Sequence, residues 1–381
     1  MTETDPLRSR ASAASAPAVP EPRANPDLVG HAAAERTLLR AWTSGRLPHA
    51  WLIAGPRGIG KATLAFRFAR FVLAGGPGSA EGFAAASGGG LFGAPDDLFV
   101  EPADPVARRV ASGGHADLRT LQRTFNEKRE RLRSEIVVDD VRDVGAFLHL
   151  TPAEGGWRVV VVDNADELNR SAANALLKVL EEPPARALLL LVSHAPGRLL
   201  PTIRSRCRRL ALAPLPEATV AGLLARYRPD LDAADAAALA RLAEGSIGRA
   251  VELAAAGGLD LYREVAGLML GLPRLDSAAL HGLGDRFARA DGEAAFRTAA
   301  GLLGRWLGRM VHAGAAGAPP SEVLPGEADC MRRLLAAGGL DQWLELWEKV
   351  GRLFARTDSV SLDRKQVWVT AFLEIEVLAR P

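Results

Sequence analysis

The feature that most constrains this fold is a glycine-rich turn between a short apolar segment and a helical pattern. Residues 50–54 are apolar and run directly into the sequence Gly55-Pro56-Arg57-Gly58-Ile59-Gly60-Lys61. After the lysine, apolar residues recur at i, i+4, i+7 and i+8, as on one face of a helix: Leu64, Phe68, Phe71 and Val72. This order predicts a phosphate-binding loop, because loop N–H groups and a helix N-terminus attract phosphate.

Two positions near this loop lack the groups that phosphate chemistry needs. Ala62 follows the lysine, where a Ser or Thr hydroxyl would hold the magnesium ion of a nucleotide. Thr63 is a poor substitute, because a step of about 100° around the helix points it elsewhere. The apolar segment 157–162 ends in Asp163, which is suited to face the metal, but Asn164 follows and cannot take a proton at neutral pH. The sequence therefore predicts a phosphate cradle without hydrolytic chemistry of its own.

The composition excludes a general attraction to polyanions. The 381 residues include 47 Lys and Arg against 45 Asp and Glu, a net charge of +2. Cys207 and Cys330 are too few for a disulfide framework or a four-thiolate zinc site, so no zinc is expected. The acidic start lacks the apolar core of a signal peptide, and no stretch approaches the roughly 20 apolar residues of a membrane helix. We expect a cytoplasmic chain without membrane contacts.

The pattern along the chain predicts several regions. Residues 1–24 are rich in Ala and Pro and are expected to form a disordered tail. In residues 25–213 apolar strands alternate with helical patterns, which predicts an α/β fold with a parallel sheet. Residues 214–257 read as a three-helix unit, and residues 258–381 read as a second helical domain.

The segment 75–135 is the variable part of the α/β region. Its first part, residues 75–93, is rich in Gly, Ala and Ser and is expected to be a flexible loop. Its last part carries six cationic side chains: Arg119, Arg123, Lys128, Arg129, Arg131 and Arg133. Two interpretations remain open for this part, a solvated charged helix or hairpin and a phosphate-contacting patch.

A longer string reveals a resemblance to a known family. The residues 174–184, Asn-Ala-Leu-Leu-Lys-Val-Leu-Glu-Glu-Pro-Pro, are followed by Ser205-Arg206-Cys207. Together with His49-Ala50-Trp51 before the loop and Gly30-His31, they resemble bacterial clamp loader subunits of the AAA+ class. The resemblance is close from residue 25 to residue 214, and residues 361–366 are similar to the last helices of such subunits. It implies a RecA-like AAA+ module, a small helical lid over residues 214–257 and an all-α collar, or oligomerisation, domain.

Within that family the chain is similar to the non-motor subunits. Motor subunits have Lys-Thr in the loop, Asp-Glu after the strand and a zinc module with four cysteines. This chain has Ala62, Asn164 and no cysteine before Cys207. The resemblance implies a stator subunit of the DNA polymerase III clamp loader, which helps to load a sliding clamp onto primed DNA. Its implied partners are the gamma/tau and delta subunits, the clamp and primed DNA. No intrinsic ATP hydrolysis is expected, although the complex belongs to a DNA-directed DNA polymerase, a nucleotidyltransferase.

The resemblance also assigns roles to residues. Arg206 would act catalytically in trans, as an arginine finger on the γ-phosphate held by a neighbouring subunit, whereas its simplest other role is a surface salt bridge. A degenerate ATP site, either binding ATP without hydrolysis or empty, would consist of Gly55, Gly58, Gly60, Lys61, Asp163 and Ser193. No residue is expected to bind a metal as a fixed ligand.

The family pattern also bears on three further places in the sequence. The polar residue that senses the γ-phosphate is either Ser193 or His194. Arg249 follows Gly248, the slot where motor subunits have arginine, so a place on the helix surface is expected for it. Glu181 and Glu182 close a helix before two prolines, which favours a structural role or subunit contacts over acid catalysis.

Two alternatives differ in class. A catalytically active gamma/tau-type clamp loader ATPase would have to tolerate Ala62 and Asn164. A DNA-remodelling AAA+ helicase would form a homo-hexamer with an intact hydrolysis site, and the residues Ser205-Arg206-Cys207 argue against it.

Overall fold

The computed structural model describes residues 19–75, 95–126, 131–154, 156–360 and 362–380. Most of the expected disordered tail and nearly all of the expected flexible loop therefore lie outside the described residues. The chain divides into two compact units. The first comprises residues up to 229 together with 244–248, and the second comprises 230–243 together with 249–381.

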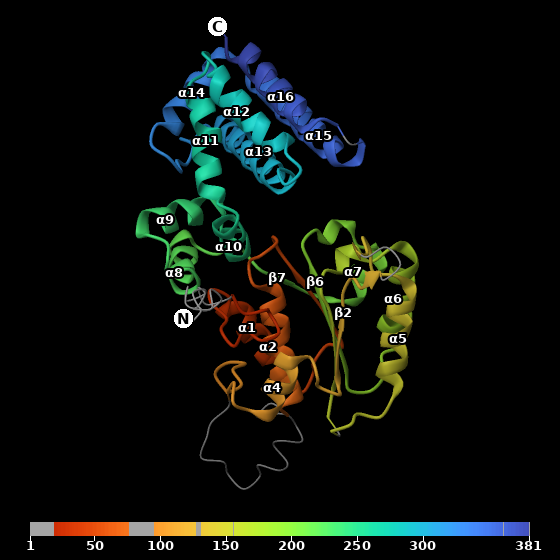
Figure 1. Cartoon of the computed structure of the whole chain (residues 1–381). Coiled ribbons are helices and arrows are strands. Elements are labelled where there is room, and N and C mark those ends of the chain that lie inside the picture. The colour runs from red at the N-terminus through yellow and green to blue at the C-terminus, as the bar shows by residue number, and fades with distance from the viewer. Residues whose placement is uncertain (1–18, 76–94, 127–130, 155, 361, 381) are drawn as a thin grey trace, which may run out of the picture. The chain divides into compact units, whose positions relative to one another are not determined.

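The first unit is built on a five-stranded parallel sheet (Figure 1). The strand order is β2-β5-β6-β1-β7, with the bounds Leu118–Leu121, Arg158–Val162, Ala187–Ser193, Ala50–Ala54 and Arg208–Ala211. Every residue of β1, β5 and β6 is buried. Because both faces of these central strands are covered, their sequences are nearly continuous apolar runs. The predicted parallel α/β fold is confirmed.

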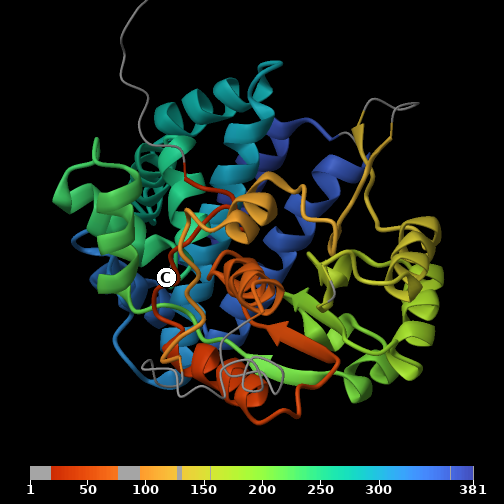
Figure 2. The ribbon, with the colours of Figure 1, turned by 90° about the horizontal axis from the view of Figure 1, so that it is seen from below.

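Helices cover both faces of this sheet. One face carries α1, α2 and α4 (Ala32–Thr43, Lys61–Leu73 and Pro105–Ser112), and their core with the sheet includes Trp42, Phe68 and Phe71. The other face carries α5, α6 and α7 (Val138–His149, Arg170–Glu181 and Pro201–Arg206). Figure 2 shows the strands between α2 and the yellow-green helices. The parallel sheet thus places the carboxyl ends of its strands, and the loops that follow them, along one edge.

The start of α6 follows from its sequence. The Asn169 side chain accepts a hydrogen bond of 2.9 Å from the backbone N–H of Ala172, as the cap predicted from the sequence requires. The helix ends at Glu181, two residues before a pair of prolines that cannot continue it. Most of the string 174–184 that resembles the clamp loader family therefore lies in one helix with defined ends.

Where the structure describes it, the cationic segment before α5 forms short strands. After β2, the short strands β3 (Phe125–Asn126) and β4 (Arg131–Leu132) pair antiparallel. Phe125 and Leu132 lie opposite each other and are 59% and 51% exposed. Lys128 and Arg129 lie outside the described residues, so the phosphate-contacting interpretation stays a prediction.

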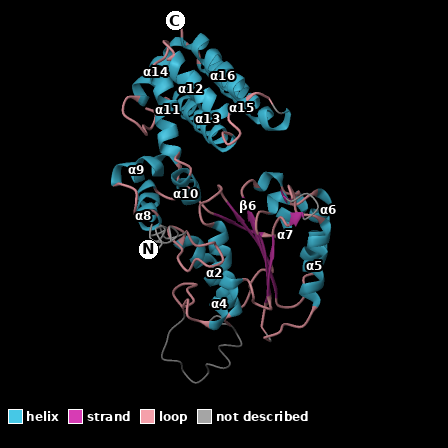
Figure 3. Cartoon of the chain, viewed as in Figure 1, coloured by secondary structure: helices cyan, strands magenta, loops and turns pink. Residues whose placement is uncertain are grey.

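The remaining described elements are helices (Figure 3). α8 (Glu217–Tyr227) belongs to the first unit, and α9 (Ala233–Leu242) belongs to the second. The lid boundaries at 214 and 257 therefore stay a prediction. The other helices are α10 to α16: Ile247–Ala255, Gly258–Leu270, Ser277–Ala288, Glu293–Ala316, Glu327–Ala337, Leu340–Val360 and Arg364–Ala379.

A large aromatic core and a buried ionic network hold the second unit together. Trp306, Trp343 and Trp368 are fully buried, as expected of core aromatics. Glu327 is also fully buried, and its carboxylate pairs with Arg309 and accepts a hydrogen bond from the Tyr262 hydroxyl. These contacts join α11, α13 and α14 through side chains as well as through apolar packing.

Candidate functional site

The predicted phosphate loop lies between β1 and α2, at the carboxyl end of a central strand. Its glycines have φ angles of +153° at Gly55, +75° at Gly58 and +102° at Gly60, in the range that disfavours other residues. A Cβ atom at Gly55 would also lie 2.5 Å from the carbonyl oxygen of Leu212. The loop conformation therefore requires glycine for both steric and backbone reasons.

Lys61, the first residue of α2, turns back onto this loop. Its side chain is buried, and the ammonium group donates a hydrogen bond to the carbonyl oxygen of Pro56. Burial lowers the pKa of Lys61 to about 8, while the carboxylates of Asp166 and Asp163 act in the opposite direction. The lysine expected to meet a phosphate is thus held among loop backbone and two acids.

Asp163, the residue expected to face a metal ion, follows β5 directly, and the next residue is not a water-activating acid. Burial raises the pKa of Asp163, and the neighbouring Glu167 raises it further. Asn164 adopts the left-handed conformation with φ of +71°. Its side-chain oxygen is buried and has no hydrogen-bond partner among the described residues. An amide at this position cannot remove a proton from water.

Asp166 is a site residue that the sequence motifs did not reveal. Its carboxylate accepts a hydrogen bond of 2.7 Å from the Ser193 hydroxyl. It also accepts hydrogen bonds from the backbone N–H groups of His194 and Ala195 at the end of β6. The only sequence signal was an aspartate three residues after Asp163, which has no assigned role in the phosphate-loop motif.

The two candidate sensor residues differ in their surroundings. The Ser193 side chain is fully buried and its hydroxyl is engaged by Asp166. Burial lowers the pKa of His194 to about 4, and the nearby cations Lys61 and Arg57 contribute in the same direction. His194 is therefore neutral at pH 7, and the positive charge of Lys61 helps to keep it so. Which of the two senses a phosphate stays open.

Two backbone contacts support the loop from outside. The Nε2 atom of His31 lies 2.6 Å from the carbonyl oxygen of Ile59, and burial lowers the pKa of this histidine. The N–H group of Gly248 donates a hydrogen bond of 2.9 Å to the carbonyl oxygen of Gly58. A Cβ atom at Gly248 would lie 2.9 Å from the Gly58 Cα atom. Gly248, at the sequence position where motor subunits have arginine, is thus in close contact with Gly58.

Arg206 lies at the end of α7. Its guanidinium pairs with Glu181, with 2.7 Å between Nη2 and Oε1, and donates a second hydrogen bond of 3.1 Å to the carbonyl oxygen of Thr202. The side chain is 35% exposed. Next to it, Cys207 is buried, which raises the pKa of its thiol to about 12 and leaves it unreactive. In the isolated chain Arg206 thus makes a partly exposed ion pair and its partners lie on α6 and α7.

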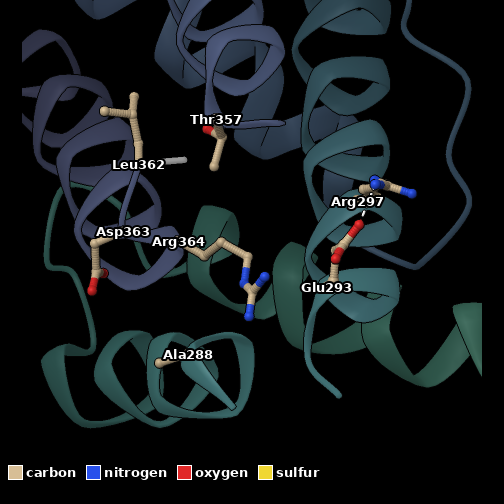
Figure 4. A pocket seen from close by; sticks show the side chains of 7 residues that line it. All are labelled: Ala288, Glu293, Arg297, Thr357, Leu362, Asp363 and Arg364. Atoms are coloured by element: carbon tan, nitrogen blue, oxygen red, sulfur yellow. Dashed lines mark hydrogen bonds and ion pairs between the residues drawn. The ribbon is translucent and has the colours of Figure 1, made fainter. Parts of the chain in front are cut away.

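A cavity of about 370 Å³ lies in the second unit (Figure 4). Arg364 extends from the start of α16 toward the end of α12, where it donates hydrogen bonds to the carbonyl oxygens of Phe287 and Arg289. Glu293 and Arg297, also on the wall, pair with each other. These charges cap a helix end and join neighbouring turns, so they indicate structural roles.

Among the residues that the structure describes, no group of three or more His, Cys, Asp or Glu residues is arranged to hold a metal ion. No helix that the structure describes combines the length and the apolar character needed to cross a membrane.

Comparisons with known proteins show similarity to subunits of DNA polymerase III. The family described as "DNA polymerase III, delta subunit" matches residues 99–216. The delta prime subunit of DNA polymerase III from Pseudomonas aeruginosa is 40% identical over 199 residues, which are 52% of this chain and 53% of that protein. The Escherichia coli delta prime subunit is 36% identical over 216 residues, 57% of each chain. The Bacillus subtilis tau subunit is 30% identical over 185 residues, 48% of this chain and 28% of that protein.

The match spans about half the length of the curated delta prime relatives. It includes the strands and the helix that position Asp163, Ser193 and Arg206. Over this matched region the chain is similar to the delta prime subunits of DNA polymerase III.

Proposed function

We propose that this chain is the non-motor, stator subunit of a DNA polymerase III clamp loader and supplies Arg206 to the ATP of a neighbouring motor subunit. Its partners would be the gamma/tau and delta subunits, the sliding clamp and primed DNA. The observation that carries the proposal is the contrast between its two functional regions. The chain's own site lacks the hydroxyl and the carboxylate for hydrolysis, while Arg206 is partly exposed at the end of α7.

The chain's own site supports at most ATP binding without hydrolysis. Ala62 offers no magnesium ligand, and Asn164 offers no base. The glycine loop and the N-terminus of α2 nevertheless present backbone N–H groups that favour phosphate. Bound ATP would have to draw Lys61 from the carbonyl oxygen of Pro56.

Arg206 suits a role across a subunit boundary. A guanidinium is always charged and its planar fork of N–H donors matches phosphate oxygens. Placed on a γ-phosphate, it would stabilise the charge that develops during phosphoryl transfer. The short α7 fixes the backbone at Arg206, because Ile203 and Cys207 on either side are buried in the core.

A gamma/tau-type ATPase is the second candidate, favoured by the 30% identity to a tau subunit. The two candidates differ in where hydrolysis takes place. The motor hydrolyses ATP on its own loop, whereas the stator stimulates hydrolysis on another subunit.

The decisive experiment is steady-state ATP hydrolysis by the purified chain, alone and mixed with its cognate motor subunits. We expect no hydrolysis alone and a mixed activity that falls sharply with Arg206→Ala. Arg204→Ala is the matched control, because it removes an exposed arginine from the same helix. Hydrolysis by the chain alone, or an equal loss with Arg204→Ala, would contradict the proposal.

A further inference from the structure

The end of α6 places a carboxylate on Arg206. Glu181 is the last residue of α6, and its Oε1 atom lies 2.7 Å from Nη2 of Arg206. Nη1 of the same guanidinium donates to the carbonyl oxygen of Thr202. The side chain is therefore held by two different helices, which fixes the direction of the guanidinium.

The position of Glu181 is unfavourable for a carboxylate in the absence of a cation. The carbonyl groups at a helix C-terminus carry partial negative charge and repel acids. Glu182 follows directly, is exposed and adds a second negative charge. The guanidinium of Arg206, 2.7 Å from Glu181, offsets part of this repulsion.

We propose that Glu181 is a positioning residue that orients Arg206 toward the ATP of the neighbouring subunit. This inference rests on the arginine-finger function proposed above. A carboxylate and a phosphate present similar oxygen geometry to a guanidinium. Arg206 can therefore exchange Glu181 for a phosphate without changing its own conformation.

The exposure of the pair favours such an exchange. Glu181 and Arg206 are 47% and 35% exposed, so water screens their attraction and the ion pair is weak. A weak pair can order the long arginine side chain before the phosphate arrives and still release it. Ordering in advance reduces the entropy lost when the finger engages.

The test uses the complex of this chain with its cognate motor subunits. Glu181→Gln preserves the size of the side chain and removes its charge. We expect it to lower kcat for the Arg206-dependent part of ATP hydrolysis by about 3- to 10-fold, through loss of orientation. KM for ATP should stay unchanged, because the nucleotide is bound by the neighbour. Glu181→Asp, which keeps the charge, should recover part of the rate, and Glu182→Gln is the matched control.

The double variant separates positioning from stability. If Glu181 acts through Arg206, adding Glu181→Gln to Arg206→Ala should cause no further loss. A further loss of the same factor, or an unchanged or raised rate in Glu181→Gln alone, would overturn the inference. If Arg206→Ala itself has no effect, the proposed function fails. If only the Glu181 variants have no effect, the finger stands and the positioning role fails.

Discussion

The N–H group of Gly248 donates a hydrogen bond to the carbonyl oxygen of Gly58, with 2.9 Å between nitrogen and oxygen. This contact joins the first turn of α10 to the phosphate loop within the first unit. It depends on two residues without side chains. Even a Cβ atom at position 248 would meet the loop backbone, 2.9 Å from the Gly58 Cα atom.

Gly248→Ala tests this close approach. The added Cβ would lie 2.9 Å from Gly58 Cα, and the backbone there cannot move aside cheaply. We expect a destabilisation of about 1–3 kcal/mol, as for other overpacked positions, measured by urea unfolding. The control is Gly222→Ala on α8, where the new Cβ would point into open space. That change should stabilise by about 0.5–1 kcal/mol, because alanine favours helix. Equal effects of the two variants would contradict the close contact.

Substitutions of Asn164 test how much its left-handed backbone conformation affects stability. Its φ of +71° lies in the left-handed region, and its side-chain oxygen has no partner among the described residues. Asn164→Ala should therefore destabilise by about 1 kcal/mol through the backbone alone. Asn164→Gly should have little effect, because glycine accepts this conformation. Equal losses with glycine and alanine in urea unfolding would show that the side chain, and not the backbone conformation, matters. Asn164→Glu carries the same backbone cost as alanine.

Lys61 should make stability depend on pH above neutrality. Its pKa is about 8 in the folded chain and 10.5 for an ordinary lysine, so between these values the unfolded state binds more protons. Stability should consequently rise as the pH increases from about 8 to 10.5, and below pH 8 this contribution is constant. Urea unfolding of the wild type and Lys61→Met at several pH values measures the difference. Lys349→Met, an exposed lysine on α15, is the control. Parallel pH profiles for wild type and Lys61→Met would refute a lowered pKa.

The substitution Glu327→Gln tests the contribution of the buried ionic network in the second unit to stability. Its carboxylate is fully buried and accepts hydrogen bonds from Tyr262, Arg309 and the backbone N–H of Val323. Glu327→Gln would leave the Arg309 charge uncompensated, so we expect a loss of about 3 kcal/mol in thermal or urea unfolding. Asp329→Asn breaks an exposed pair with Arg332 on the same helix and should change stability by less than about 1 kcal/mol. Similar losses from both changes would argue against a special role for burial.

Much of the first unit could be predicted from local sequence. The strands β1, β5 and β6 were visible because burial on both faces demands uninterrupted apolar residues. Asn169 and the two prolines fixed the ends of α6, and the glycines with Lys61 identified the loop. For the cationic residues before α5 the sequence left a helix or a hairpin open, because β3 and β4 have only two residues each and are too short to show apolar periodicity.

By itself, the sequence predicted a phosphate cradle without the hydroxyl of a motor subunit, because both features lie within eight consecutive residues. Tertiary structure alone decided the partners of the site residues: Asp166 with Ser193, Gly248 with Gly58, and Glu181 with Arg206. Each pair joins elements far apart along the chain. The physical reason is that the order of the parallel strands and the packing of helices on the sheet bring these residues within hydrogen-bond distance, which no local pattern encodes.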